Sequence, residues 1–275
     1  VMHKDKTVEM LIEKIERRLD DKLMMTVSDV AKFSGYSIRY VQKIFKEITG
    51  LKISDYIKKR RLTQAALLIK LTKKSIDNIS SELNFSTQQS FTRAFKREFQ
   101  ISPIKFRQQK YFDCSSFTPS LTKFPYQYAM YTTSLGTLKL NGEEFTIKET
   151  LLKKTSSRAN DIRLKEITKK LHNNANVYIV TRFLAKSTYT SEIYLQTFIG
   201  CSDSKATYDI NAGDCLAIDF SGIWDDYIIF GRFILFYINV KLEQCIIERI
   251  SLGEVSYDNK QTYHITSFLP LVGNE

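Results

Sequence analysis

Residues 75–99 read SIDNISSELNFSTQQSFTRAFKREF, and this stretch decides how the first part of the chain folds. Apolar residues recur at helical spacing on both sides of Asn84 and Phe85, where the pattern breaks. The apolar positions are Ile76, Ile79 and Leu83 before the break, and Phe91, Ala94, Phe95 and Phe99 after it. The stretch therefore predicts two helices joined by a tight turn, which is a helix-turn-helix unit.

Residues 26–50 predict a second unit of the same kind. Thr26 followed three residues later by Asp29 has the form of a capping box, which starts a helix. Gly35 is placed to end that helix, because glycine adopts a left-handed turn most easily, and Ser37 is placed to cap the next one. The inward face of this next helix consists of Val41, Ile44, Phe45 and Ile48.

Two further helices are predicted around these units. Apolar residues at helical spacing over residues 8–23 predict a packing helix, and residues 53–70 predict one longer helix that carries the cationic run at residues 58–61. At 1.5 Å per residue the longer helix spans about 27 Å. A helix of that length could hold the two units roughly one DNA turn, about 34 Å, apart, so that a monomer reads two adjacent major grooves.

The second helix of each unit leaves hydrogen-bond donors on its outward face. The outward residues are Arg39, Gln42, Lys43 and Lys46 in the first unit, and Gln88, Gln89, Thr92, Arg93, Lys96 and Arg97 in the second. Donors repeated every three or four positions suit a helix that presents side chains to base edges in a major groove. Two such helices on one short domain favour sequence-specific binding of duplex DNA.

Charge is divided unequally along the chain of 275 residues. Residues 1–112 contain 24 Lys and Arg against 12 Asp and Glu, whereas residues 113–275 contain 17 against 18. A basic module joined to a nearly neutral one indicates two domains with different tasks, the first of them facing a polyanion. We therefore expect a DNA-binding domain at residues 1–112, a polar, proline-punctuated linker at residues 113–125 and a second domain at residues 126–275.

The first domain resembles the AraC/XylS family of transcription activators over residues 7–111. The resemblance rests on residues 79–85 (ISSELNF), 88–96 (QQSFTRAFK), 102–103 (SP) and 106–107 (FR), and upstream on residues 34–37 (SGYS), 45–46 (FK) and 49–50 (TG). Asn84 stands where the family usually has glycine, but asparagine tolerates the same left-handed conformation. Arg39 stands where close relatives often have tryptophan, so the target sequence is expected to differ from theirs.

The resemblance implies a role for each outward residue. It implies base contacts from Arg39, Gln42, Lys43, Gln88, Gln89 and Arg93. Gln pairs well with adenine, and Arg or Lys with guanine. Phosphate contacts are expected from Lys46, Thr92, Lys96, Arg97, Lys105 and Arg107, and these position the protein without reading sequence. The family further implies double-stranded promoter DNA and RNA polymerase as partners.

Beyond residue 125 the hydrophobic period changes from 3.6 to 2. Strands are predicted at residues 176–186, 191–200, 214–220, 244–252 and 262–271, with helices at residues 161–173 and 225–242. The predicted fold class is thus an all-α double helix-turn-helix domain followed by an α+β domain with an antiparallel sheet.

This second half resembles the GyrI-like, SOUL-type effector domain of Rob-like regulators, through residues 212–222 (AGDCLAIDFSG) and 267–270 (SFLP). In ligand-binding relatives such a domain forms an aromatic pocket, with an acidic residue where this chain has Thr266. That departure argues against a cationic ligand and leaves a neutral ligand, an anion or none. The candidate pocket residues are Tyr178, Tyr194, Phe198, Trp224, Tyr227, Thr266 and Phe268.

Other classes of function find little support. His3, His172 and His264 lie in no catalytic constellation, the four cysteines are too far apart for a metal knuckle, and no stretch is long and apolar enough for a membrane span. We expect no catalytic residue, metal or cofactor, and a cytoplasmic, bacterial protein. Three alternatives remain: a ligand-responsive activator, an activator whose second domain only contacts protein, and a nonspecific architectural protein, which would not need paired reading helices.

Overall fold

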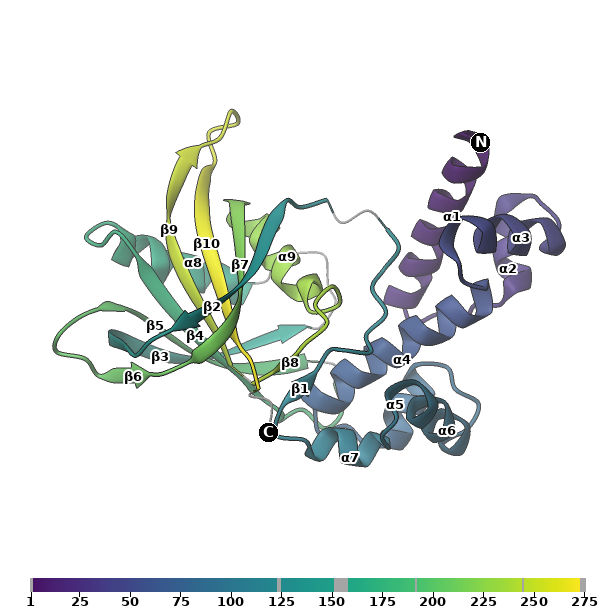
Figure 1. Ribbon diagram of the computed structural model, residues 1–275, viewed down its shortest axis with the longest axis horizontal. Helices are drawn as coiled ribbons and strands as arrows, with labels where there is room; N and C mark the ends of the chain where they lie inside the picture. The colour runs from purple at the N-terminus through teal and green to yellow at the C-terminus, as the bar shows by residue number, and fades with distance from the viewer. Residues whose placement is uncertain (1, 123–124, 151–157, 191, 244, 273–275) are drawn as a thin grey trace. The chain divides into compact units, whose positions relative to one another are not determined.

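The computed structural model describes residues 2–122, 125–150, 158–190, 192–243 and 245–272. Within it the chain forms two compact units (Figure 1). The helical unit comprises residues 1–70, 74–108 and 116–125, and the sheet unit comprises residues 71–73, 109–115 and 126–275. In the described part of the chain, no helix is long and apolar enough to cross a membrane.

Seven helices are described in the first part of the chain. They are α1 (Met2–Asp20), α2 (Val27–Ser34), α3 (Ile38–Thr49), α4 (Ile53–Leu71), α5 (Ile76–Glu82), α6 (Gln88–Phe99) and α7 (Pro103–Gln108). The pairs α2–α3 and α5–α6 are the two helix-turn-helix units. The predicted helical fold of this region is therefore confirmed, although α1 starts six residues and ends three residues before the predicted range, and α7 was not predicted.

The helix ends follow the local chemistry of the sequence. Thr26 and Asp29 form the predicted capping box of α2, and Gly35 ends this helix with φ of 72°. Ser37 caps α3 by accepting a hydrogen bond from the backbone N–H of Tyr40. In the second unit Asn84 occupies the left-handed region at φ 59°, so the turn forms without the glycine usual at this position.

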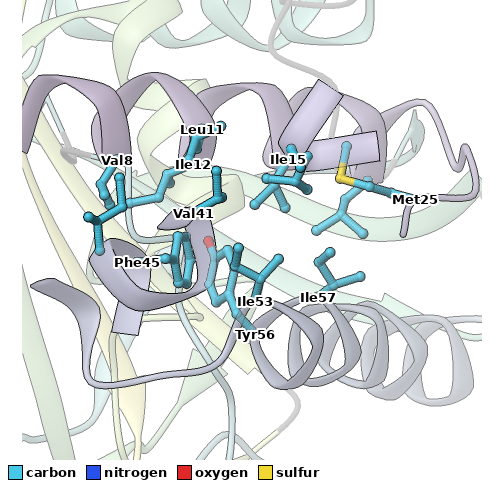
Figure 2. Packing of buried hydrophobic residues seen from close by; sticks show 14 residues of the cluster. Val8, Leu11, Ile12, Ile15, Met25, Val41, Phe45, Ile53, Tyr56 and Ile57 are labelled. Carbon is cyan, nitrogen blue, oxygen red and sulfur yellow. The ribbon is translucent and has the colours of Figure 1, made fainter. Parts of the chain in front are cut away.

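The core of the first helix-turn-helix unit joins α1, α3 and α4. Figure 2 shows Leu11, Ile15 and Met25 above Phe45 and Tyr56, all of them buried. Ile48, expected to point inward with Phe45, is instead 42% exposed. The helical period was therefore wrong at this position in the last turn of α3.

A buried ion pair lies beside this core. Glu16 of α1 accepts hydrogen bonds from Arg60 of α4, at 2.9 Å from Nε and 2.7 Å from Nη2, and from the Tyr56 hydroxyl at 2.5 Å. Arg60 is 2% exposed, so it contributes nothing to the surface charge of the cationic run. Burial, and then the Glu16 charge, raise the pKa of Tyr56.

Residues 116–122, inside the expected linker, pack against α4. The backbone of Thr118 accepts from Arg60 Nη1 at 2.9 Å and donates to the hydroxyl of Thr63 at 3.0 Å, and the backbone N–H of Leu121 donates to the Tyr56 hydroxyl at 3.0 Å. Residues 123 and 124 lie outside the described residues. This segment thus closes one side of the helical unit.

The sheet unit is built on one antiparallel sheet with the strand order β2-β7-β10-β9-β4-β5-β3-β6. Its strands are β2 (Tyr128–Leu135), β3 (Leu138–Thr150), β4 (Val177–Leu184), β5 (Glu192–Ser202), β6 (Tyr208–Ile210), β7 (Gly213–Ile223), β9 (Cys245–Val255) and β10 (Gln261–Pro270). The helices are α8 (Arg158–Leu171) and α9 (Trp224–Ile234), and β1 (Phe112–Asp113) pairs with β8 (Lys241–Leu242). The expected α+β architecture with an antiparallel sheet is confirmed.

The order of strands has an internal two-fold pattern. Along the chain, β2-β3-α8-β4-β5 is followed by β6-β7-α9-β9-β10. In the sheet, β9 and β4 pair with each other at the centre. Outward from β9 the strands are β10, β7 and β2, and outward from β4 they are β5, β3 and β6, so these strands occupy corresponding positions. The edge strand of each half therefore pairs with the other half.

Two predicted features of this unit were wrong. The second helix was expected to run to residue 242, but α9 ends at Ile234, and residues 241–242 form the short strand β8. Strands β2 and β3 were missed, because most of their residues are polar or exposed and show no clean alternation of apolar side chains. The expected first residues of two strands, Ser191 and Gln244, lie outside the described residues.

Candidate nucleic-acid interface

Helix α3 presents a polar face to solvent. Val41, Ile44 and Phe45 anchor it with no exposed surface. The opposite face carries Arg39, Gln42, Lys43 and Lys46, all exposed. Lys43 lies 3.8 Å from Glu47 one turn away, with 69% of its side chain exposed. A pair this exposed is worth little, so it leaves the ammonium available to another partner.

Helix α6 repeats this arrangement in the second unit. Phe91, Ala94 and Phe95 are buried, and Thr87 caps the helix through a capping box with Ser90. The residues Gln88, Gln89, Arg93, Lys96 and Arg97 are exposed, and Thr92 is half-buried. The structure thus gathers the predicted base-contacting residues of each unit on one exposed helix face.

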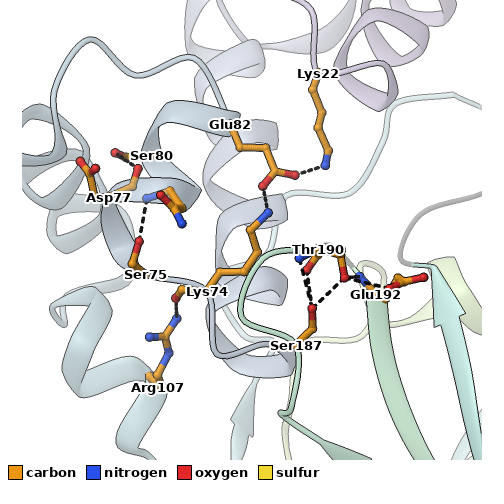
Figure 3. A network of polar contacts seen from close by, with 11 residues as sticks. Lys22, Lys74, Ser75, Asp77, Ser80, Glu82, Arg107, Ser187, Thr190 and Glu192 are labelled. Atoms are coloured by element: carbon orange, nitrogen blue, oxygen red, sulfur yellow. Dashed lines mark hydrogen bonds and ion pairs between the residues drawn. The ribbon is translucent and has the colours of Figure 1, made fainter.

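Glu82 of α5 connects the two helix-turn-helix units. Its carboxylate pairs with Lys22, after α1, through one oxygen and with Lys74, before α5, through the other (Figure 3). Asn84 Nδ2 also donates to the Lys22 carbonyl at 2.7 Å. The second unit is therefore attached to the end of α1, in addition to its connection through α4. We call Lys22, Lys74, Glu82 and Asn84 the junction clamp.

Arg107 differs from the other predicted phosphate contacts. It is half-buried, and its guanidinium donates to the carbonyl of Ile69 at 3.0 Å and to that of Lys74 at 2.6 Å. Figure 3 shows the second of these bonds. Desolvation lowers the pKa of Arg107. Its donors tie α7 to the end of α4, whereas Lys105 on the same helix is exposed. We therefore correct the assignment of Arg107 from a phosphate contact to a structural residue.

The predicted effector-pocket residues do not lie together. Cross-strand pairing places Tyr178, Tyr194, Phe198, Thr266 and Phe268 on one face of the sheet, which we call the open face. Trp224 and Tyr227 belong to α9, which packs on the other face. A single pocket lined by all seven residues is therefore excluded, because the sheet separates them.

Two residues of the open face belong to a core. Phe198 and Phe268 are 6% and 5% exposed and cluster with Leu140, Val180 and Ile247. Phe198 also stacks on Tyr208 with ring centroids 4.5 Å apart. These aromatic rings support the sheet at one end. Tyr194 lies further along β5, opposite Lys148 and Leu184.

A polar row crosses the centre of the open face. Tyr178, Arg249, Thr266 and Asp219 are direct cross-strand neighbours on β4, β9, β10 and β7. Thr266 Oγ1 donates to Asp219 at 2.7 Å and accepts from Arg249 Nη2 at 3.3 Å. Beyond Tyr178 the row continues with Gly200, which adds no side chain. Sequence reasoning found Tyr178 and Thr266 but not Asp219 and Arg249, because only the strand register brings these together.

The helix-covered face holds a buried polar network. The Tyr227 hydroxyl donates a hydrogen bond to Glu248, and its oxygen lies 2.9 Å from the hydroxyl oxygen of Ser267. Arg163 of α8 contacts Glu248 of β9 at 3.2 Å, and Arg232 of α9 contacts Glu149 of β3 at 2.8 Å. Each ion pair joins a helix of one half to a strand of the other. Trp224 donates to the backbone of Asn160 at 3.2 Å, so both aromatic residues have a structural role here.

Within the described residues, no group of three or more His, Cys, Asp or Glu side chains is arranged to hold a metal ion.

The sheet unit also contains a small separate set of hydrogen bonds, drawn in Figure 3. The hydroxyl oxygens of Ser187 and Thr190 lie 2.7 Å apart, and the Thr190 hydroxyl donates to Glu192. These bonds order the turn before β5.

Two helix-turn-helix units with exposed cationic and amide side chains on the second helix of each define a DNA-binding protein. A family model described as a helix-turn-helix domain matches residues 30–109. The regulatory protein SoxS of Salmonella typhimurium is 38% identical over 106 residues, which cover 38% of this chain and 97% of SoxS. The chain belongs to the AraC family of DNA-binding transcriptional regulators.

Other relatives match in the same region. The HTH-type transcriptional regulator YkgA of Escherichia coli K12 is 40% identical over 119 residues, or 43% of this chain and 49% of YkgA. The transcriptional regulator Rob of Salmonella typhimurium is 36% identical over 107 residues, or 39% of this chain and 36% of Rob. The chain thus matches about half of YkgA and about a third of Rob. Both relatives carry names of transcriptional regulators.

Proposed function

We propose that this protein is a sequence-specific transcription activator that reads two adjacent major grooves of promoter DNA with α3 and α6. The observation that carries the proposal is the repetition of one arrangement, in which exposed Arg, Lys and Gln side chains line the face of each helix opposite its buried anchor residues. A nonspecific architectural protein would need the positive charge but not two such helices.

Each reading helix has its own proposed contacts. In α3, Arg39, Gln42 and Lys43 contact bases and Lys46 contacts a phosphate. In α6, Gln88, Gln89 and Arg93 contact bases, while Thr92, Lys96 and Arg97, together with Lys105 of α7, contact phosphates. The activator further recruits RNA polymerase through exposed surface of the same unit, as the AraC-family resemblance implies.

The reading helices are tested by replacing one arginine in each. A preferred DNA site is first selected from a random duplex pool with the full chain. Arg39→Ala and Arg93→Ala should each weaken binding to that site by roughly 1–3 kcal/mol and spare most of the affinity for unrelated duplexes. Arg17→Ala, an exposed arginine on α1, serves as the matched control. Unchanged discrimination in both variants would refute the proposed contacts.

The sheet unit is proposed to be a regulatory domain, GyrI-like in arrangement, whose effector binds the polar row of the open face. Arg249 is exposed there and Asp219 is half-buried, so a bound molecule meets both a cation and a carboxylate. Tyr178 supplies an aromatic surface beside Gly200. A cation, a carboxylate and an aromatic ring side by side favour a neutral or zwitterionic ligand that itself contains a ring.

The effector site is tested by screening small polar ring compounds for a shift in the thermal unfolding of the full chain. A binder of the open face should lose its stabilising effect in Arg249→Gln and retain it in Arg182→Gln, which changes an exposed arginine on β4. Equal loss in both variants, or none in either, would count against the polar row.

One observation favours the alternative in which the sheet unit contacts only protein. β2 is an edge strand of eight residues, Tyr128–Leu135, none of them charged, and Met130 and Tyr131 are each 43% exposed. Uncharged edge strands readily pair with another strand. A self-associating chain that Thr132→Lys makes monomeric would support this alternative.

A further inference from the structure

A small cavity lies where the two helix-turn-helix units meet. It is lined by Met25 and Thr26 before α2, by Val27 of α2, by Ser54, Ile57, Lys58 and Arg61 of α4, and by Phe85 in the turn before α6. Its volume is about 150 Å³. The lining thus comes from both units and from the helix that connects them, so an occupant would touch all three.

One side of this junction cavity is cationic. Lys58 and Arg61 both line it, and among the described residues its wall contains no carboxylate. Arg61 Nη2 is buried and has no hydrogen-bond partner among the described residues. Burial lowers the pKa of Arg61. A buried donor without a partner is costly, and an anion in the cavity would satisfy it.

The other side is apolar. Met25 and Ile57 are 5% and 4% exposed, and Figure 2 shows their side chains close to each other below α1. Phe85 adds an aromatic ring that packs edge-on against Phe91 at 5.0 Å. A simple oxyanion such as phosphate has nothing to place against this surface. The fitting occupant therefore carries an anionic group on an apolar body.

We propose that the junction cavity binds a small aromatic carboxylate of about the size of benzoate. The carboxylate pairs with Arg61 and Lys58, and the ring lies against Met25, Ile57 and Phe85. A cavity of roughly this volume is large enough for a single benzene ring. This binding does not rest on the proposed DNA contacts, because it is measured without DNA.

The test follows the ε-methyl signal of Met25 by NMR during titration of the full chain with sodium benzoate. The signal is assigned with Met25→Leu, and the methyl of Met130 in the sheet unit is the internal reference. We expect a saturable shift at Met25 and none at Met130. Benzamide, the neutral isostere, and acetate, the carboxylate without a ring, should each bind at least tenfold more weakly.

Two charge variants complete the test. Arg61→Gln should weaken benzoate binding at least tenfold and Lys58→Gln about threefold, while Arg17→Gln on α1 should change nothing. If circular dichroism shows that Arg61→Gln does not fold, the exposed Lys58 decides the outcome.

Three results would overturn the proposal. They are no saturable shift at Met25, equal affinity for benzamide, and no effect of either charge variant. A fourth result would also overturn the proposal and would assign the cavity to the DNA backbone. It is the absence of benzoate binding together with a salt dependence of DNA affinity that indicates about one fewer released counterion in Arg61→Gln than in the parent chain. Loss of DNA discrimination alone would bear on the reading helices and not on this cavity.

Discussion

Neighbouring cationic residues of α4 have different environments. In the run of residues 58–61, Lys58 is exposed, Arg60 is 2% exposed and paired with Glu16, and Arg61 lines the junction cavity. The sequence shows only a block of positive charge. Because Glu16 lies 44 positions away, no local pattern identifies it as the partner of Arg60.

Lys70 at the end of α4 makes stability depend on pH. The side chain is buried, and desolvation lowers its pKa from 10.5 to about 8. Below pH 8 both the folded and the unfolded chain carry the proton, so folding bears the full cost of burying the charge. Between pH 8 and 10.5 the folded chain releases the proton first, so this cost shrinks as the pH rises.

We therefore expect Lys70→Met to stabilise the protein at pH 7 and to lose this advantage between about pH 8 and 10. Urea unfolding of both chains at pH 7, 8, 9 and 10 measures the difference in free energy of unfolding. Lys52→Met, which changes an exposed lysine, should show no such trend. A difference between Lys70→Met and the parent that stays constant with pH would contradict the assignment.

At the scale of elements, we expect the junction clamp to set how α5 and α6 are placed relative to α1 and α2. Glu82 lies between two ammonium groups, and its side chain is only 16% exposed. Glu82→Gln preserves its size and removes its charge. The two reading helices should then tolerate more variation in their separation.

The expected result is a weaker preference for the spacing between the two half-sites. Discrimination against a DNA site with one extra base pair should fall by roughly 1 kcal/mol, or about fivefold, in Glu82→Gln. Binding to duplexes carrying a single half-site should stay unchanged. Glu13→Gln, an exposed glutamate on α1, is the control. The same spacing profile in Glu82→Gln as in the parent chain would show that the clamp does not set the separation.

Most helices of the helical unit could be predicted from the sequence, whereas several elements of the sheet unit could not. Caps such as Thr26, Ser37 and Gly35 mark helix ends by local chemistry, and a buried face at period 3.6 marks the helices between them. Strand β2 has mostly exposed side chains, so its pairing with β7 leaves no local signal. The exposed faces of α3 and α6 follow from the same helical period, so the residues proposed to contact DNA could be named from the sequence, whereas the polar row depends on a strand register that only the fold defines.

At the scale of the whole molecule, the reactivity of the cysteines measures the opening of the sheet unit alone. Cys114, Cys201, Cys215 and Cys245 all lie in the sheet unit and are free. Burial raises the pKa of Cys215 to about 11 and also raises that of Cys114. A thiol of raised pKa in a buried position reacts slowly, because the thiolate is the reactive form.

We expect Cys201, which is partly exposed, to be alkylated first at pH 8. Cys114 and Cys215 should react more slowly than in the unfolded chain by a factor on the order of 100, since they require the sheet to open. Mass spectrometry of peptides after timed treatment with iodoacetamide measures all four rates. Rapid labelling of Cys215 in the native protein would contradict the buried position of β7.

The strand order of the sheet unit has a consequence for synthesis on the ribosome. β10, the last of the described strands, lies between β7 and β9 in the interior of the sheet. Until β10 emerges, β7 and β9 each lack a neighbour, and the strands on its two sides cannot join into one sheet. The last residues of the helical unit, 116–125, precede β2–β7, β9 and β10, the strands of this sheet, so this unit can fold before them. A nascent chain would thus hold a finished DNA-reading unit ahead of an open sheet, and a stop codon before β10 would release it in that state.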